Sequence, residues 1–139
     1  MSRGRTMSRR RFLLLSAGFG ASCVTGLAPL PASADPRAAV PPADRLLGLV
    51  RGRSSAGVVG AAYLELVPSE ADGDRLVEAI VGGLEGGEGA LRCGREELRG
   101  RLARRVAGDF AQGATIELRG WIVSRTEARL CALAALDEI

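Results

Sequence analysis

The stretch SRTEARLCALAALDEI, residues 124–139, contains the strongest local signal for the fold of this chain. Its first four residues match a capping box, in which the Ser124 hydroxyl accepts from the Glu127 amide and the Glu127 carboxylate accepts from the Ser124 amide. The box predicts a helix that runs from here to the C-terminus. Its packing positions are mostly small, so a neighbouring helix can approach closely. These positions are Ala128, Cys131, Ala132, Ala135 and Leu136.

The residues just before this helix favour extended structure. Residues 114–123, ATIELRGWIV, are rich in β-favouring side chains around a central Gly120, which predicts a short extended segment or a small hairpin. We expect Trp121, the only tryptophan, to fill the core beneath the C-terminal helix. The alternative is an interface anchor, because a rigid aromatic side chain offers a large contact area.

Apolar residues at three- and four-residue spacing predict helices over the rest of residues 44–139. We expect helices at about 43–50, 56–67, 72–84 and 95–111, the second capped by Ser54 or Ser55 and the third by Asp72. The glycine-rich stretch around 82–90 has no lysine to complete a phosphate-binding loop, so we interpret it as a flexible connector. The fold class is therefore all-α: a small bundle of four to five short helices with a brief extended segment before the C-terminal helix.

The predicted 95–111 helix combines an apolar ridge with many arginines. Leu98, Leu102, Val106 and Phe110 recur every four residues, and Glu97 is spaced to form an ion pair with Arg101. Six arginines lie between Arg92 and Arg105. They form either a basic docking face, with Arg101 and Arg105 as candidate interface residues, or a solvated outer face.

Few residues in the chain could carry chemistry. There is no histidine and no lysine, which excludes His-based acid–base catalysis and imidazole metal ligands, and the acids show no pairing by spacing. Cys93 and Cys131 could form a disulfide in an oxidising compartment, or they could be an incidental thiol and a small buried side chain. We predict no catalytic, cofactor-binding or metal-binding residue, and no enzyme activity of the chain by itself.

The first 34 residues have the anatomy of an export signal. A basic segment precedes an apolar run from Phe12 to about residue 28, and a small-x-small cleavage site follows at Ala32 and Ala34. The apolar run is too short and too rich in glycine for a stable membrane span. We expect a Pro-rich linker at 35–43 and a single helical domain at 44–139.

The net charge of +3 belongs to this leader, which holds five arginines and no acid. From Asp35 onward 14 arginines face 16 acids, a net charge of −2, so the basic balance gives no indication of nucleic-acid binding.

The motif Ser8, Arg9, Arg10, Phe12, Leu13 resembles the twin-arginine (Tat) signal, which exports folded proteins. A Tat leader on a small, cofactor-free helical chain resembles the small subunits of periplasmic flavin-dependent dehydrogenases of the sorbitol, fructose and gluconate kind. The resemblance implies a periplasmic, non-catalytic accessory subunit. It would escort a larger, leaderless oxidoreductase through the Tat translocase and stabilise it. The alternative is a stand-alone periplasmic binding or structural domain.

Overall fold

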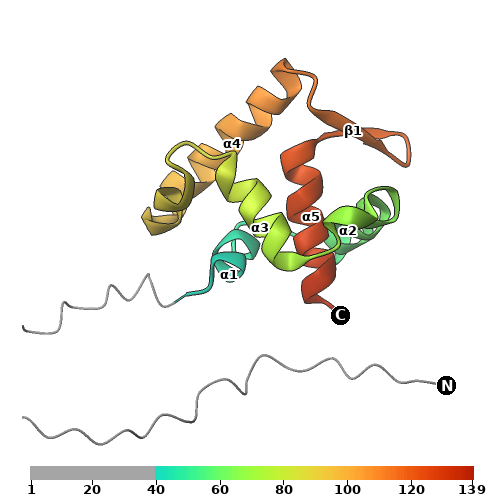
Figure 1. Cartoon of the computed structure of the whole chain (residues 1–139), viewed down its shortest axis with the longest axis horizontal. Helices are drawn as coiled ribbons and strands as arrows, with labels where there is room; N and C mark the ends of the chain where they lie inside the picture. Colours follow the sequence, from blue (N-terminus) through green and yellow to red (C-terminus); the bar gives the residue numbers. More distant parts are fainter. Residues whose placement is uncertain (1–39) are drawn as a thin grey trace, which may run out of the picture. The chain divides into compact units, whose positions relative to one another are not determined.

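The computed structural model describes residues 40–139, which form a small helical domain with a two-stranded hairpin (Figure 1). The predicted fold class is confirmed. The elements in chain order are α1 (Pro42–Leu47), α2 (Arg53–Leu66), the 3-10 helix η1 (Pro68–Glu70), α3 (Gly73–Gly82), the 3-10 helix η2 (Gly87–Arg92), α4 (Arg95–Ala111), β1 (Thr115–Leu118), β2 (Trp121–Ser124) and α5 (Arg125–Asp137). The predicted export motif and cleavage site lie outside the described residues.

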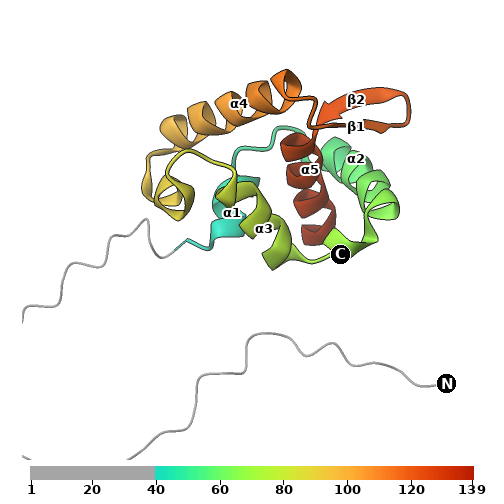
Figure 2. The same cartoon turned by 45° about the horizontal axis from the view of Figure 1, so that its top comes forward.

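Helix α5 is the centre of the domain. It contacts α1, α2, α3, α4 and both strands, and α2 lies along it most closely (Figure 2). The close approach is made possible by Gly60 of α2, where an added Cβ would lie 2.0 Å from the Cys131 carbonyl oxygen. On α5, two of the buried residues, Ala128 and Ala132, are small and have no exposed surface. The small residues that the sequence placed on this helix therefore let two backbones come together.

The core is one continuous apolar cluster around this helix pair. Its larger members come from every α-helix and from the hairpin: Leu46, Leu47, Tyr63, Leu76, Ile80, Leu98, Leu118 and Leu133 are each less than 5 % exposed.

Helix α4 has the predicted bounds, and its first half packs as expected, with Leu98 and Leu102 buried. The predicted ridge does not stay in the core, because Phe110 is 47 % exposed near the end of the helix. Helix α4 reaches the base of the hairpin there (Figure 2), so its last turn has fewer apolar neighbours. The Glu97–Arg101 ion pair forms, with 2.6 Å between the carboxylate and guanidinium.

Two helix starts differ from the sequence prediction. Helix α2 begins at Arg53, after Gly52 in a left-handed conformation (φ 67°), so Ser54 and Ser55 lie inside the helix and cap nothing. Helix α1 begins at Pro42, within the stretch assigned to the linker, because proline is well suited to the first helical turn. The predicted cap at Asp72 is confirmed, since its side chain accepts from the Arg75 amide at 3.0 Å.

The glycine-rich stretch is more ordered than predicted. Residues Gly87–Arg92 form η2, which follows a left-handed Gly86 (φ 84°) and buries Ala90 completely. The connector is therefore fixed to the core by two apolar side chains, Leu84 and Ala90.

The extended segment is a hairpin with a two-residue turn. Leu118 pairs with Trp121 and Ile116 with Val123, in antiparallel register. Both turn residues, Arg119 (φ 51°) and Gly120 (φ 85°), have positive φ, as in the turn type that matches the twist of hairpin strands.

Candidate functional site

The hairpin carries the most exposed large aromatic side chain of the described residues. Trp121 is 74 % exposed and its neighbour Ile122 is 67 % exposed. The expectation that Trp121 fills the core beneath α5 is therefore wrong. Its register partner Leu118 fills that place instead, at 4 % exposure, because Leu118 lies on β1, the strand that packs against α2 and α5, whereas Trp121 lies on the outer strand β2 (Figure 2).

The base of the hairpin is held firmly at the start of α5. The predicted capping box is present: Ser124 Oγ accepts from the Glu127 amide at 3.0 Å and Glu127 Oε2 accepts from the Ser124 amide at 3.1 Å. Asp109 of α4 adds a third bond that the sequence did not predict, accepting from the Thr126 amide at 2.9 Å. All three bonds satisfy amides that a helix start leaves without partners.

Asp109 is only 1 % exposed, and its second carboxylate oxygen lies 3.2 Å from Nε of Arg105. A buried carboxylate that serves both a helix start and an arginine links α4 rigidly to α5. The i,i+4 spacing from Arg105 could have indicated the ion pair, but no spacing in the sequence indicates the bond to Thr126, which is 17 residues away. The hairpin is therefore presented from a stiff base, as a binding element requires.

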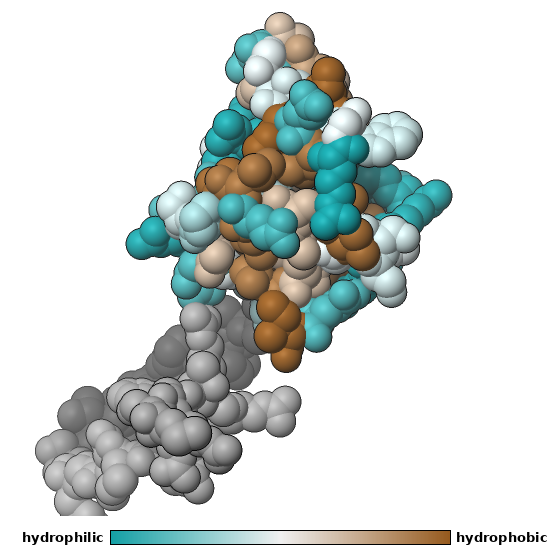
Figure 3. Space-filling model, turned by 90° about the vertical axis from the view of Figure 1, so that its right-hand side faces the viewer, coloured by the Kyte–Doolittle hydropathy of each residue, from teal (hydrophilic) through white to brown (hydrophobic). Residues whose placement is uncertain are grey.

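Apolar side chains gather on this side of the molecule. The space-filling view of the side from which the hairpin projects shows apolar residues over the centre of the face and hydrophilic residues around them (Figure 3). The other exposed large apolar side chains of the described residues lie outside the hairpin and are not assigned to its surface: Val40, Val58, Leu66, Phe110 and Ile139. Exposed apolar surface bordered by polar residues is typical of interaction sites.

The two arginines proposed as interface residues are engaged within the domain. The Arg101 guanidinium bonds the Glu97 carboxylate and the Glu85 carbonyl, and its side chain is 22 % exposed. The Glu97 carboxylate raises the pKa of Arg101 above its ordinary value. Arg105 pairs with Asp109, as described above. The Arg101 guanidinium fixes α4 to the preceding connector, and Arg105 pairs within α4 itself. Trp121 is therefore the member of the predicted interface that is most exposed.

A second polar cluster joins η1 to α5, and no spacing along the chain predicts it. The Arg129 guanidinium donates twice to Glu70, at 2.7 and 2.9 Å, and the buried Tyr63 hydroxyl donates to the same carboxylate at 2.6 Å. These hydrogen bonds, Arg129 first, lower the pKa of Glu70 to about 2. Burial, reinforced by Glu70, raises the pKa of Tyr63.

Each side chain of this cluster hydrogen-bonds another member of it. These bonds hold the α2–α3 connection against α5, and they leave none of the three side chains free to act as a base or nucleophile.

Cys93 and Cys131, the two cysteines of the described residues, are free thiols, so they form no disulfide with each other in this structure. Cys93 ends η2 and its Sγ is 3.9 Å from the Gly89 carbonyl, whereas Cys131 lies in the middle of α5 beside α2. Burial raises the pKa of the Cys131 thiol, which makes it a poor nucleophile. Within residues 40–139 no group of cysteine and acid side chains is arranged to hold a metal ion.

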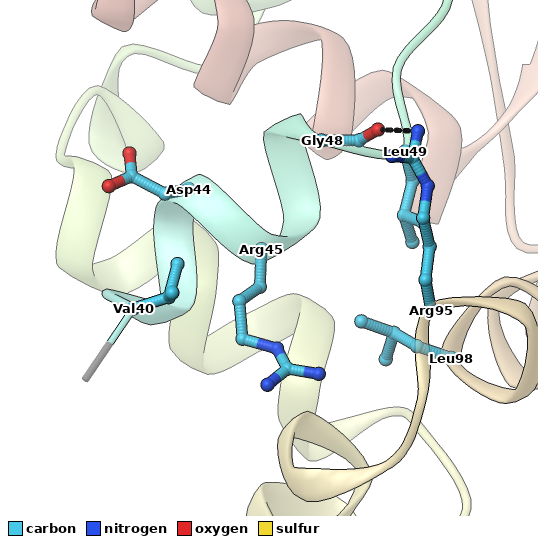
Figure 4. Close-up of a pocket in the computed structure, with 7 residues that line it drawn as sticks. All are labelled: Val40, Asp44, Arg45, Gly48, Leu49, Arg95 and Leu98. Atoms are coloured by element: carbon cyan, nitrogen blue, oxygen red, sulfur yellow. Dashed lines mark hydrogen bonds between the residues drawn. The ribbon is translucent and has the colours of Figure 1, made fainter. Parts of the chain in front are cut away.

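A pocket of about 400 Å³ lies between α1 and the start of α4 (Figure 4). Arg95 donates to the Gly48 carbonyl at 2.5 Å across one side, and Arg45 donates to the Cys93 carbonyl at 2.5 Å. Leu49 and Leu98 supply apolar lining, while Asp44 points away from the other side chains (Figure 4). The arginines thus tie α1 to the η2–α4 junction.

Comparison with known proteins adds no assignment: no protein-family model, no curated protein and no solved structure matches this chain. In the part of the chain that the structure describes, no helix has the length and apolar character of a membrane span.

Proposed function

We propose that the chain is a non-catalytic accessory subunit that binds a larger protein through the hairpin and is exported together with it. The observation that carries the proposal is the 74 % exposure of Trp121 on a hairpin whose base is fixed by Asp109 and Ser124. A folded protein leaves a large aromatic ring in water at a cost, and such rings often become the central contacts of interfaces.

The export route and the partner class rest on the leader. The resemblance of residues 8–13 to a Tat signal supports transport of a protein that is already folded. The resemblance to small dehydrogenase subunits makes a leaderless oxidoreductase the expected partner. No residue of this chain is assigned a catalytic role in that complex.

The test is co-purification from the periplasm of the native host. Tagged full-length chain should retain one larger protein, and Trp121→Ala should lose it while remaining folded by circular dichroism. Val58→Ala is a matched control, because Val58 is 57 % exposed on α2. Replacing both Arg9 and Arg10 by lysine should leave chain and partner together in the cytoplasm. A chain that is exported alone and monomeric would contradict the proposal and favour the stand-alone periplasmic domain.

A further inference from the structure

The open edge of β2 is the part of the hairpin that can pair with another backbone. The backbone amides and carbonyls of successive β2 residues point alternately toward β1 and toward the open edge, and one observed hydrogen bond shows which residues face each way. The Arg125 amide donates to the Ala114 carbonyl at 2.9 Å across the base of the ladder. Because inward and outward groups alternate along an antiparallel strand, Val123 and Trp121 also bond inward. Ser124 and Ile122 therefore direct their amides and carbonyls away from β1.

Only one of these outward amides is already used. The Ser124 amide donates to Glu127 within the capping box. Among the described residues, nothing accepts from the Ile122 amide or donates to its carbonyl. An exposed donor and acceptor on one residue match a single residue of an antiparallel strand, which can satisfy both at once.

The side chains around this edge suit an apolar strand. Trp121 and Ile122 are successive residues, so they lie on opposite faces of the hairpin. A strand placed beside β2 would cover part of both side chains, which are 74 % and 67 % exposed and can therefore lose apolar surface to the partner. Cross-strand contacts of this kind stabilise an added strand beyond its backbone bonds.

The charged residues at the two ends of β2 indicate which charges an added strand should carry at its own ends. Arg119 and Arg125 flank β2, and neither forms a salt bridge within the described part of the chain. Two acids lie nearby: Glu117 pairs with Ile122 on β1, one strand further from the open edge, and Glu127 is held by the Ser124 amide at the base of β2. The charge of Arg125 also acts on Glu70, so Arg119 is the freer of the two cations. A second copy paired antiparallel about Ile122 would place Arg119 opposite Arg125 of the other copy, and such like-charge pairs are unfavourable.

We propose that β2 binds an extended segment of a partner protein by antiparallel strand addition at Ile122. The segment has an apolar centre and acidic residues on both sides. This inference rests on the proposed function, since it names how the accessory subunit recognises its partner. Strand addition gives affinity through the backbone and selectivity through side chains at alternate positions.

The test uses three blocked peptides and the full chain. The probe is EEVTVTVEE, and the controls are RRVTVTVRR and an EEVTVTVEE peptide with N-methylated central amides. Binding is followed by the emission of Trp121, the only tryptophan, and by hydrogen exchange at the Ile122 amide. We expect the first peptide to bind about tenfold more tightly than the arginine peptide, with an affinity that falls as salt is raised. The EEVTVTVEE peptide should also slow hydrogen exchange at the Ile122 amide. The N-methylated peptide should neither bind tightly nor slow this exchange.

The matched variant is Ile122→Pro, which removes the outward donor and leaves the ladder bonds of the hairpin in place. It should lose the glutamate peptide, while Val58→Lys on α2 should bind it normally. If the proline variant does not fold, the N-methylated peptide tests the other hydrogen bond of the same pair, in which the peptide amide donates to the Ile122 carbonyl. Equal binding of all three peptides, or unchanged exchange at Ile122, would overturn the inference. Protection of Ile122 that depends on protein concentration alone would point to a second copy and also overturn it.

The periplasmic co-purification separates this inference from the proposed function. A larger protein retained equally by the wild type and by folded Ile122→Pro would leave the accessory function standing and overturn strand addition. Failure of the wild type to retain any protein would count against the accessory function, whichever peptide binds.

Discussion

Replacing Gly60 by alanine tests the contact on which the whole domain depends. Gly60 lies in α2 where that helix meets the backbone of α5. An added Cβ would be 2.0 Å from the Cys131 carbonyl oxygen, 2.3 Å from its carbonyl carbon and 2.6 Å from the Ala132 nitrogen. All three are backbone atoms, so no side-chain rotation relieves the clash.

The geometry sets the size of the effect. A Cβ almost never approaches a heavy atom closer than 3.0 Å, so α2 and α5 must separate by about 1 Å near this point. Overpacking of this kind costs about 3 kcal/mol or more when backbone has to move. Alanine returns about 1 kcal/mol through its better helix propensity. The free energy of unfolding should therefore fall by about 2–3 kcal/mol, which lowers Tm by about 10–20 °C in a domain of this size.

Urea and thermal unfolding followed at 222 nm would measure the change. Gly57→Ala is the matched control, one turn away in the same helix, where the added Cβ meets only the flexible end of the Glu138 side chain at 2.6 Å. That variant should match or slightly exceed the wild-type stability. If Gly60→Ala proved as stable as Gly57→Ala, the close packing of α2 on α5 would be refuted.

Two further predictions concern the polar clusters. Because the folded-state pKa of Glu70 is about 2 against an ordinary value of 4.5, the stabilisation from this carboxylate is complete above about pH 4.5 and is lost as pH falls toward 2. Glu70→Gln should cost about 1–2 kcal/mol at pH 7, because solvent screens this partly exposed pair, and it should flatten the acid limb of a stability-against-pH curve. Glu65→Gln, at an exposed acid of α2, should do neither, and an unchanged acid limb in Glu70→Gln would contradict the assignment. Ser124→Ala should lower the free energy of unfolding by about 1–2 kcal/mol through loss of the α5 cap. Its control, Ser55→Ala, lies inside α2 with no capping bond and should change stability by less than about 0.5 kcal/mol. Equal losses in the two serine variants would argue against the capping box.

The features that the sequence predicted correctly are those determined by residues close together in the chain. The capping box of Ser124 and Glu127 needs only four consecutive residues, and the Asp72 cap and the Glu97–Arg101 pair need no more than one turn of helix. Helix α4 was predicted with its correct bounds because glycines stand at both of its ends. The hairpin followed from β-favouring residues around Gly120.

The features that the sequence could not predict join residues that are distant in the chain. Asp109 reaches the start of α5, and Glu70 meets Arg129 across 59 positions, because folding brings η1 and α5 together. The local sequence pattern also could not predict whether Trp121 is buried or exposed, since an aromatic residue before a capped helix is compatible with either position.

The chain's local order thus fixed its helices, its caps and its turn, because those depend on backbone preferences and hydrogen bonds within a few residues. The tertiary structure alone decided that Leu118 fills the core while Trp121 and the Ile122 edge stay open. The physical reason is that folding brings β1 against α2 and α5, which cover Leu118, and leaves the side chains of Trp121 and Ile122 on the outer strand β2 exposed.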